Sequence, residues 1–315
     1  MSTKIFIDGE AGTTGLQIRS RLDSRTDLEM IRLEGPARKD ESARREAINE
    51  SDIVILCLPD EAAREAVSLI ARDHVRVIDA STAYRTAQGW VYGFPEMAPG
   101  QHRAIAAAQR VTNPGCYPTG AIALLRPLVE HGIVPKGWPV TVNAVSGYSG
   151  GGKSLIAAFE DPAASNHTTD NFRIYALGLG HKHIAEMQLY CDLHHPPLFA
   201  PSVGRFAQGM IVEVPLQLWA LPGATGPDEI RDILEGAYRD SYFVEVASRE
   251  ETEALSSLDP ERLNGTNRLK LFVFGNEELG QARLVALLDN LGKGASGQAV
   301  QNLNIMIGVD EATGL

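Results

Sequence analysis

The stretch Lys4-Ile5-Phe6-Ile7-Asp8-Gly9-Glu10-Ala11-Gly12-Thr13-Thr14-Gly15 decides how this chain is expected to fold. Residues 4–8 are mostly apolar, as in a short buried strand, and Leu16, Ile18 and Leu22 then recur as they would in a helix. The glycines between them follow GxxGxxG, a variant of the dinucleotide-binding GxGxxG turn, which lets the backbone approach a pyrophosphate at a helix N-terminus. We therefore predict a cofactor on Gly9, Gly12, Thr13, Thr14 and Gly15; a tight turn without a ligand is the alternative.

The segments that follow alternate between strand and helix. Residues 51–59 form a continuous apolar run, typical of a parallel strand buried on both faces, and residues 60–70 look helical before a further strand at 75–79. This order predicts an α/β fold with a Rossmann-type, doubly wound parallel sheet. Ligands of such sheets bind beyond the carboxyl ends of the strands. We therefore expect Ser81 near the cofactor and Arg85 on a phosphate or carboxylate, with a surface ion pair as the alternative for Arg85.

The choice of cofactor depends on residues 34–39. The strand expected at 28–33 ends at Glu34, and an acidic residue there usually accepts from a ribose 2′-hydroxyl and favours NAD. Arg38 and Lys39 follow, and a basic pair suits the 2′-phosphate of NADP. The two signals conflict, and a solvated loop is the alternative for the basic pair. We predict NADP.

The candidate nucleophile lies in Asn113-Pro114-Gly115-Cys116-Tyr117-Pro118-Thr119-Gly120. Asn-Pro-Gly makes a tight turn, and the apolar run 121–125 after it predicts a helix in which Pro118 is tolerated in the first turn. Cys116 is then at or just before a helix N-terminus, where free N–H groups and the helix dipole stabilise a thiolate. The alternative is a buried thiol that only packs.

A glycine-rich segment, residues 146–154, follows a strand expected at 140–144. Residues 147–154 formally fit the phosphate-binding pattern GxxxxGK[ST], so a nucleoside triphosphate site competes with other interpretations. The apolar run at 155–159 is short before Asp161-Pro162, and the chain already opens with a dinucleotide-type turn. We predict a mobile loop near substrate with Lys153 on an anion; a plain flexible loop is the alternative.

Residues 177–187 hold the candidate acid/base. If a helix begins after Gly180, His181 and His183 point about 200° apart, and His183 lies beside Glu186 at i, i+3. Glu186 would then orient His183, as in an activated nucleophile site. If the segment is a strand, both histidines share a face and Glu186 points away. The apolar positions after Gly180 favour the helix and His183, with His181 as the second candidate, and no further ligands surround the pair at a zinc spacing.

The rest of the chain completes a second fold unit. Residues 210–216 and 268–274 alternate like half-buried strands, and with 140–144 and 282–288 they predict a mixed sheet. Helices are expected at 227–238, 250–255 and 297–306, and the last of these needs a partner surface that the first unit could provide.

Composition limits the class of protein. The chain has 315 residues, enough for two domains, and a formal net charge of −11, which disfavours nucleic acid and anionic membranes as partners. Three cysteines, at 57, 116 and 191, have no zinc spacing and point to a reducing compartment. Because of this spacing we also expect no metal. The opening residues do not resemble a signal peptide, so we expect a cytoplasmic chain.

These motifs resemble those of the N-acetyl-gamma-glutamyl-phosphate reductase family, in its short form, over essentially the full length. The resemblance rests on residues 9–15, 79–85, 113–119, 181–186 and 290–299, and the cysteine motif is its most specific part. One departure is Ala185, where the family often has proline. Aspartate-semialdehyde dehydrogenases share the fold and mechanism, but their cysteine motif reads differently.

The resemblance implies a fold, a reaction and further site residues. It implies a Rossmann domain of residues 1–115 plus 296–315 and an α+β domain of residues 116–295 that makes the contact of a homo-oligomer, a dimer or tetramer. It implies NADPH-dependent reduction of N-acetyl-glutamyl 5-phosphate through a Cys116 thioester, with a histidine as acid/base, and it adds Asn290 and Gly294 to the cofactor site. Two alternatives stay open: a related semialdehyde dehydrogenase, and a catalytically silent NADP-binding protein.

Overall fold

The computed structural model of the chain describes residues 2–223 and 225–315, which divide into two compact units. Unit 1 comprises residues 1–95, 99–114 and 295–315, and unit 2 comprises residues 96–98 and 115–294. Each unit contains its own sheet, one wholly parallel and one mixed. The predicted fold class is therefore confirmed. Among the described residues, no helix is long and apolar enough to cross a membrane.

Unit 1 is built on a six-stranded parallel sheet with the order β2-β1-β3-β4-β6-β5. The winding direction reverses between β1 and β3, which lie side by side, and ligands of such sheets bind at this switch point. The strands are β1 (Thr3–Asp8), β2 (Leu28–Ile31), β3 (Ile53–Leu56), β4 (Arg76–Asp79), β5 (Val91–Tyr92) and β6 (Arg110–Thr112).

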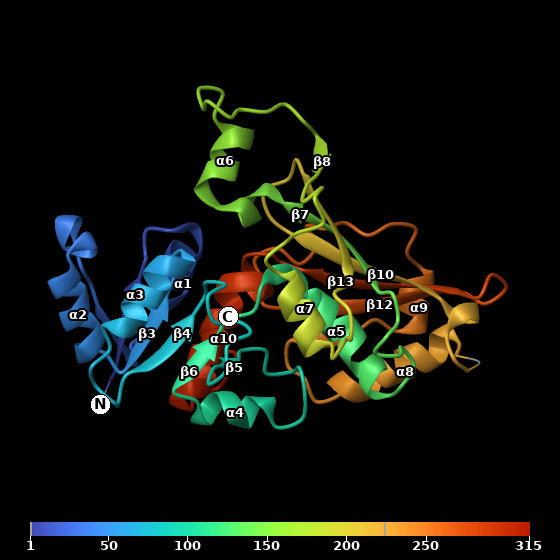
Figure 1. Cartoon of the computed structure of the whole chain (residues 1–315), viewed down its shortest axis with the longest axis horizontal. Coiled ribbons are helices and arrows are strands. Elements are labelled where there is room, and N and C mark those ends of the chain that lie inside the picture. The colour runs from blue at the N-terminus through green and yellow to red at the C-terminus, as the bar shows by residue number, and fades with distance from the viewer. Residues whose placement is uncertain (1, 224) are drawn as a thin grey trace. The chain divides into compact units, whose positions relative to one another are not determined.

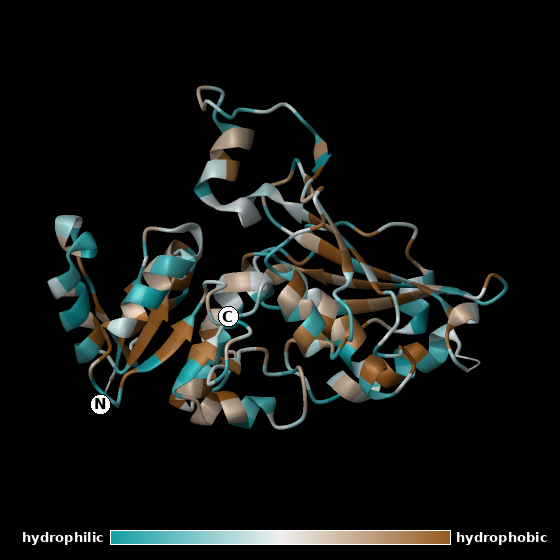
Figure 2. Cartoon of the chain, viewed as in Figure 1, coloured by the Kyte–Doolittle hydropathy of each residue, from teal (hydrophilic) through white to brown (hydrophobic). Residues whose placement is uncertain are grey.

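Helices cover both faces of this sheet. One face packs on α1 (Thr13–Leu22), α4 (Gln101–Ala107) and α10 (Gly297–Ile307), and the other packs on α2 (Glu41–Glu50) and α3 (Asp60–Ser68). Figure 2 shows the strands as hydrophobic and α2 as hydrophilic, as expected for a sheet buried on both faces. The 3-10 helix η1 (Gly35–Lys39) follows β2, which is two residues shorter than predicted.

Unit 2 is built on a seven-stranded mixed sheet with the order β11-β12-β13-β10-β7-β9-β8. The pairs β7–β9 and β11–β12 are parallel and the other pairs are antiparallel. The strands are β7 (Thr141–Gly147), β8 (Phe172–Ile174), β9 (Leu198–Gly204), β10 (Met210–Gln217), β11 (Val244–Val246), β12 (Leu269–Asn276) and β13 (Gln281–Leu288).

The helix α5 (Cys116–Glu130) packs against the centre of this sheet, and α7 (Ile184–Tyr190) and α8 (Pro227–Tyr238) contact α5 (Figure 1). The close approach depends on Gly120, where an added Cβ would lie 2.9 Å from the Cβ of Val212 on β10. Twelve residues of α5 are buried, so its position is fixed by the core. The short helix α9 (Arg249–Glu253) packs on β12.

The glycine-rich segment after β7 has more regular structure than the loop that we predicted. It forms the 3-10 helix η2 (Tyr148–Gly151) and then α6 (Gly152–Glu160), which ends before Asp161-Pro162. The side chain of Asn290 donates to Ser149 Oγ at 3.0 Å and accepts from the N–H of Gly209 at 2.7 Å. The buried amide therefore joins the start of this segment to the core of unit 2.

Candidate active site

The glycine turn of unit 1 fits a dinucleotide. Gly9 has a φ of +86°, and a Cβ there would lie 2.3 Å from the carbonyl oxygen of Cys57 after β3. A Cβ at Gly15 would lie 2.6 Å from the carbonyl oxygen of Gly9, so glycine is required at both positions. No side chain caps the start of α1 at Gly12, and its first turn carries no acidic residue, which suits a phosphate near Thr13 and Thr14.

A network of charges surrounds Glu10 within the same turn. Arg19 forms an ion pair with Glu10, and Arg38 approaches it at 3.9 Å while donating to the carbonyl of Leu33 at 2.9 Å. Arg38 therefore lies beside the predicted pyrophosphate turn. Lys39 and Glu34 are exposed at opposite ends of η1, and neither forms a described ion pair, so both remain predicted cofactor determinants.

The carboxyl end of β4 carries a buried hydrogen-bond network. The hydroxyl and N–H of Ser81 donate to the carboxylate of Asp79 at 2.8 and 3.2 Å. Burial raises the pKa of Asp79 to about 6, although Ser81 and Arg85 oppose the shift. Arg85 is 8% exposed and donates to the carbonyl of Ala80 at 3.2 Å. The predicted ligand-binding pair Ser81 and Arg85 thus flanks an acid that titrates close to neutral pH.

Cys116 is the first residue of α5, as the sequence predicts for a thiolate site. Its side chain is partly buried and is not part of a disulfide. Gly294, in the π-helical turn η4 (Gly292–Ser296), lies against it, and an added Cβ would be 2.8 Å from the Cβ of Cys116. Gly294 was predicted for the cofactor site from the family motif; the structure adds that it sets the space beside the thiol.

The two histidines lie differently from our prediction. The helix α7 begins at Ile184 rather than after Gly180, and His183 is its N-cap residue. The rings of His181 and His183 are therefore not about 200° apart: their centroids are 4.7 Å apart at an interplanar angle of 71°. The prediction failed because the turn at 181–183 precedes the helix.

Tyr117 links these histidines to the cysteine helix. Its ring lies 5.7 Å from that of His183 and 6.1 Å from that of His181, and its hydroxyl accepts from Tyr175 at 2.8 Å. Burial, the Tyr175 hydroxyl and the charge of Cys116 all raise the pKa of Tyr117. Cys116, His181, His183 and the two tyrosines thus belong to one neighbourhood in unit 2.

His181 is held in one tautomer. The N–H of His183 donates to Nδ1 of His181 at 3.2 Å, so the neutral ring carries its proton on Nε2. Burial, with a smaller effect of the Lys182 charge, lowers the pKa of His181 to about 4. At neutral pH this ring is uncharged and presents a donor.

The remaining predicted residues of unit 2 differ in burial. Glu186 is 1% exposed, and its Oε2 accepts from the N–H of Gly115 at 2.9 Å. Asn290 is also buried, and its amide binds Ser149 and Gly209 as described above. Lys153 is exposed on α6, as an anion-binding residue would be.

Sequence reasoning missed an ion pair next to Gly294. Lys293 is fully buried, and its Nζ lies 2.7 Å from Glu96 Oε1 and 5.4 Å from the ring centroid of Phe243. A lysine in a glycine-rich motif looks like a surface residue, and its partner is almost 200 positions away along the chain. Tyr175 was missed because nothing in its local pattern marks it.

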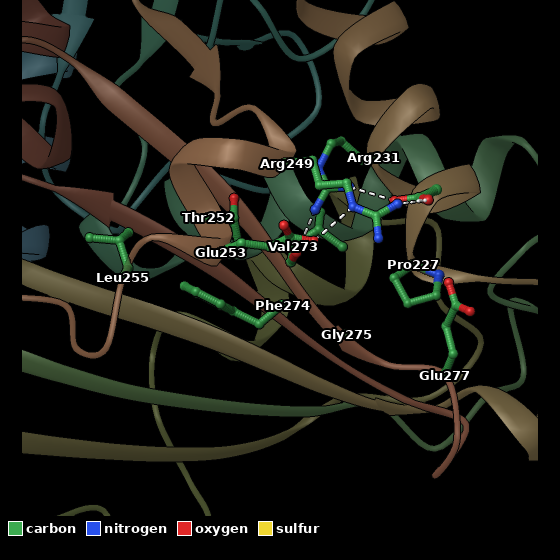
Figure 3. Close-up of a pocket in the computed structure, with 11 residues that line it drawn as sticks. Pro227, Arg231, Arg249, Thr252, Glu253, Leu255, Val273, Phe274, Gly275 and Glu277 are labelled. Carbon is green, nitrogen blue, oxygen red and sulfur yellow. Dashed lines mark hydrogen bonds and ion pairs between the residues drawn. The ribbon is translucent and has the colours of Figure 1, made fainter.

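A further pocket in unit 2 contains none of the predicted site residues among the described positions that line it. Figure 3 shows this pocket of about 340 Å³ between α8, α9 and β12. Arg231 and Arg249 both bind the carboxylate of Asp228, and Arg249 also pairs with Glu253, so two carboxylates balance the two cations. Across residues 2–223 and 225–315, no group of three His, Cys, Asp or Glu side chains could hold a metal ion.

Comparison with known proteins identifies both parts of the chain. Residues 30–105 match the semialdehyde dehydrogenase NAD-binding domain, and residues 116–290 match the semialdehyde dehydrogenase dimerisation domain. In solved structures, the aspartate-semialdehyde dehydrogenase II of Vibrio cholerae has the same fold, with a TM-score of 0.72 at 15% identity over 98% of each chain. The aspartate-semialdehyde dehydrogenase of Candida albicans, solved with NADP, has a TM-score of 0.64 at 13% identity, covering 98% of this chain and 99% of that one.

Relatives found by sequence have a much higher identity to this chain than these solved structures. A protein of Nostoc sp. named N-acetyl-gamma-glutamyl-phosphate reductase 2 is 55% identical over 99% of both chains. The N-acetyl-gamma-glutamyl-phosphate reductase of Burkholderia ambifaria is 53% identical, over 98% of this chain and 97% of its own length. At such identity and coverage, the chain belongs to the N-acetyl-gamma-glutamyl-phosphate reductase family.

Proposed function

We propose that this protein reduces N-acetyl-glutamyl 5-phosphate to N-acetyl-glutamate 5-semialdehyde and phosphate, with NADPH as reductant, in arginine biosynthesis. The observation that carries the chemistry is the position of Cys116 at the first turn of α5, beside a histidine-bearing helix that binds the same turn. The near-full-length relatives named for this reaction support the substrate.

The two units divide the work in this proposal. Unit 1 holds the dinucleotide on the turn Gly9–Gly15, with Ser81 beside it and with Arg38 and Lys39 on the 2′-phosphate. Bound NADPH supplies a hydride. Unit 2 provides the nucleophile, the acid/base and the oligomer contact.

Cys116 acts as the nucleophile. Its sulfur bonds to the acyl carbon, the bond from that carbon to the phosphate oxygen breaks, and phosphate leaves with the electron pair. The thioester carbon then gains the hydride, and the carbon–sulfur bond breaks to release the aldehyde and the thiolate. Backbone N–H groups in the first turn of α5 stabilise the oxyanion, an interaction worth about 3–4 kcal/mol per donor in comparable sites.

His183 is the proposed base. It takes the thiol proton as the sulfur attacks, gives it to the departing phosphate, and returns a solvent proton to the thiolate at the end of the cycle. The pKa of His181, lowered to about 4, makes that ring a weak base at neutral pH, which supports this choice. The Nε2–H of His181 is instead suited to donate to an oxygen.

Two cations are proposed for the anionic substrate. Arg85 has the bidentate guanidinium that suits a phosphate, and it lies at the carboxyl end of β4, where ligands of such sheets bind. Lys153 follows the glycine-rich segment that Asn290 joins to the core. Gly294 lies next to Cys116, and Asn290 binds the glycine-rich segment. Both residues also belong to the cofactor site that the family motif suggests.

The enzyme is proposed to work as a homo-oligomer in the cytoplasm. The match to a dimerisation domain over 116–290 supports the oligomer, and the three cysteines, which form no disulfide among the described residues, support a reducing compartment. Phe172, Ile174, Leu177 and Leu179 form an apolar strip, each more than half exposed, on and after the edge strand β8. A second copy of this chain is the partner that we expect on the strip.

The test is phosphate-dependent NADP reduction with N-acetyl-glutamate semialdehyde. Wild-type protein should turn over this substrate and not aspartate semialdehyde, and Cys116→Ser should lose at least about 1,000-fold in kcat. Near wild-type activity of Cys116→Ser would remove the nucleophile assignment. Preference for aspartate semialdehyde would remove the substrate, and a lower KM for NAD than for NADP would remove the cofactor assignment.

A further inference from the structure

The contact between Glu186 and Gly115 is a feature that the proposed reaction does not require by itself. Glu186 lies in the first turn of α7 and is 1% exposed, and its Oε2 accepts from the N–H of Gly115 at 2.9 Å. Gly115 is the N-cap of α5 and immediately precedes Cys116. The bond is therefore made by the backbone donor directly before Cys116. Pro114, the residue before Gly115, has no N–H.

The same bond fixes the position of α7 along α5. At the other end of α7, Arg126 of α5 donates to the carbonyl of Tyr190 at 2.9 Å. The two contacts join the helices at both ends of α7. Because His183 caps α7 and contacts Tyr117, the bond from Glu186 to Gly115 holds the histidine-bearing helix at a set position relative to the thiol.

The carboxylate also brings a charge to the start of α5. The positive end of a helix stabilises a nearby anion, whether that anion is Glu186 or the Cys116 thiolate. Two anions at one helix end repel each other, so an ionised Glu186 opposes ionisation of the thiol. Burial and the Glu186 charge raise the pKa of Tyr190 to about 12, so the effect of this carboxylate extends along α7.

Other titratable groups lie near this turn: Tyr117 and Tyr175 interact electrostatically with Cys116, the histidine rings lie beside Tyr117, and Lys293 precedes Gly294. The tyrosine hydroxyls belong to α5 and to the segment after β8, and the imidazole rings belong to the turn before α7. The lysine belongs to η4 and is bound to a glutamate. These groups are Tyr117, Tyr175, His181, His183 and the Lys293–Glu96 pair. Glu186 differs from these groups because its carboxylate accepts from the backbone N–H of the residue before Cys116.

We infer that Glu186 is a positioning residue for Cys116: it holds the turn of the nucleophile through Gly115, and its charge keeps Cys116 in the thiol form until a histidine removes the proton. This inference rests on the proposed role of Cys116. Reach and charge are separable properties of the side chain, so each can be tested by its own substitution.

The experiment compares Glu186→Gln, Glu186→Asp and Glu186→Ala in the full chain, with iodoacetamide alkylation of Cys116 followed by mass spectrometry across pH, and with steady-state kinetics. Glu186→Gln keeps an acceptor for the Gly115 N–H and removes the charge. The alkylation midpoint, which is the pH at which Cys116 reacts at half its maximal rate, should fall by about one pH unit, and the rate at pH 7 should rise about tenfold. The kcat should stay within about tenfold of wild type. Glu186→Asp keeps the charge and shortens the reach, so kcat should fall about 100-fold at an unchanged midpoint and nearly unchanged KM. Glu186→Ala should show both effects.

Glu235→Gln, an exposed glutamate on α8, is the matched control, because it makes the same charge change far along the sequence from this turn. It should leave the alkylation midpoint and kcat unchanged. An unchanged midpoint in Glu186→Gln would overturn the charge role, and an unchanged kcat in Glu186→Asp would overturn the positioning role. Failure of the proposed function looks different: Cys116→Ser would stay active while Glu186→Gln still changed alkylation.

Discussion

Gly294 is the position where a single methyl group tests the geometry of the nucleophile most directly. A Cβ there would lie 2.8 Å from the Cβ of Cys116, 3.1 Å from the carbonyl oxygen of Asp289 and 3.4 Å from the Cα of Cys116. Carbon atoms pack at about 3.5–4.0 Å, so the alanine and Cys116 must separate by about 1 Å. The nearest atom is a Cβ, which is fixed to the backbone at the start of a largely buried helix and cannot move cheaply.

We expect Gly294→Ala to lower the free energy of unfolding by about 1–3 kcal/mol, as overpacking does in well-packed cores. A displacement of about 1 Å at a reacting atom costs about 100-fold in rate. The variant should therefore lose about 100-fold in kcat and alkylate more slowly at Cys116, and a fluorescence titration with NADPH measures the cofactor role of Gly294 separately. Urea unfolding gives the stability term independently.

Gly236→Ala is the control, because a Cβ at Gly236 meets nothing within 4 Å and the residue lies inside α8. It should retain full activity and gain about 0.5–1 kcal/mol in stability. The reasoning is refuted if Gly294→Ala keeps its stability and its alkylation rate. Loss of NADPH affinity with normal alkylation would instead show that Gly294 serves the cofactor.

Three other predictions follow from buried charges and exposed apolar groups. Asp79→Asn should raise the free energy of unfolding at pH 7 by about 1–2 kcal/mol in urea titrations. Burial raises the pKa of Asp79 from 3.8 to about 6, so the stability of the wild-type protein falls as pH rises between these two values. The variant should lose this pH dependence. Lys293→Met should cost about 3–5 kcal/mol by removing the cation that pairs with the buried carboxylate of Glu96. Lys293→Met with Glu96→Gln should recover most of the loss, and equal losses in the single and double variants would contradict the pairing. Leu179→Asp, at a residue 63% exposed, should lower the molecular mass in sedimentation, while Leu279→Asp, 61% exposed on the β12–β13 turn, should not.

The strands of both sheets followed from sequence where the pattern was strong. The apolar run at 51–59 contains β3, the strand predicted at 75–79 contains β4, and the helix predicted at 227–238 is α8. Such segments are determined by burial, which depends on residue type and period. The start of α5 at Cys116 was equally predictable, because Asn-Pro-Gly ends one element and the following apolar run begins another.

The site was harder to predict because its contacts are long-range. The edge-to-face contact of His181 and His183 depends on a turn that precedes α7, and the glycine at 180 gave no information on where that helix begins. The N–H of Gly115 that Glu186 accepts from is 71 residues earlier in the chain, and local spacing pointed only to His183. Spacing rules describe neighbours on one element, so they cannot show which elements the tertiary fold brings together.

The place of α10 has a consequence for how the protein is made. Val300, Leu303 and Met306 complete the same core as Ile5, Ile18 and Ile78, which are among the first quarter of the chain to leave the ribosome. Until α10 is synthesised, the β1–β6 sheet lacks one of its covering helices and exposes an apolar face to other nascent chains. The contacts that close this core span almost the whole sequence and carry the entropy cost of a very large loop. We therefore expect the dinucleotide-binding unit, although encoded first, to finish folding last and to be the part of a newly made chain that depends most on chaperones.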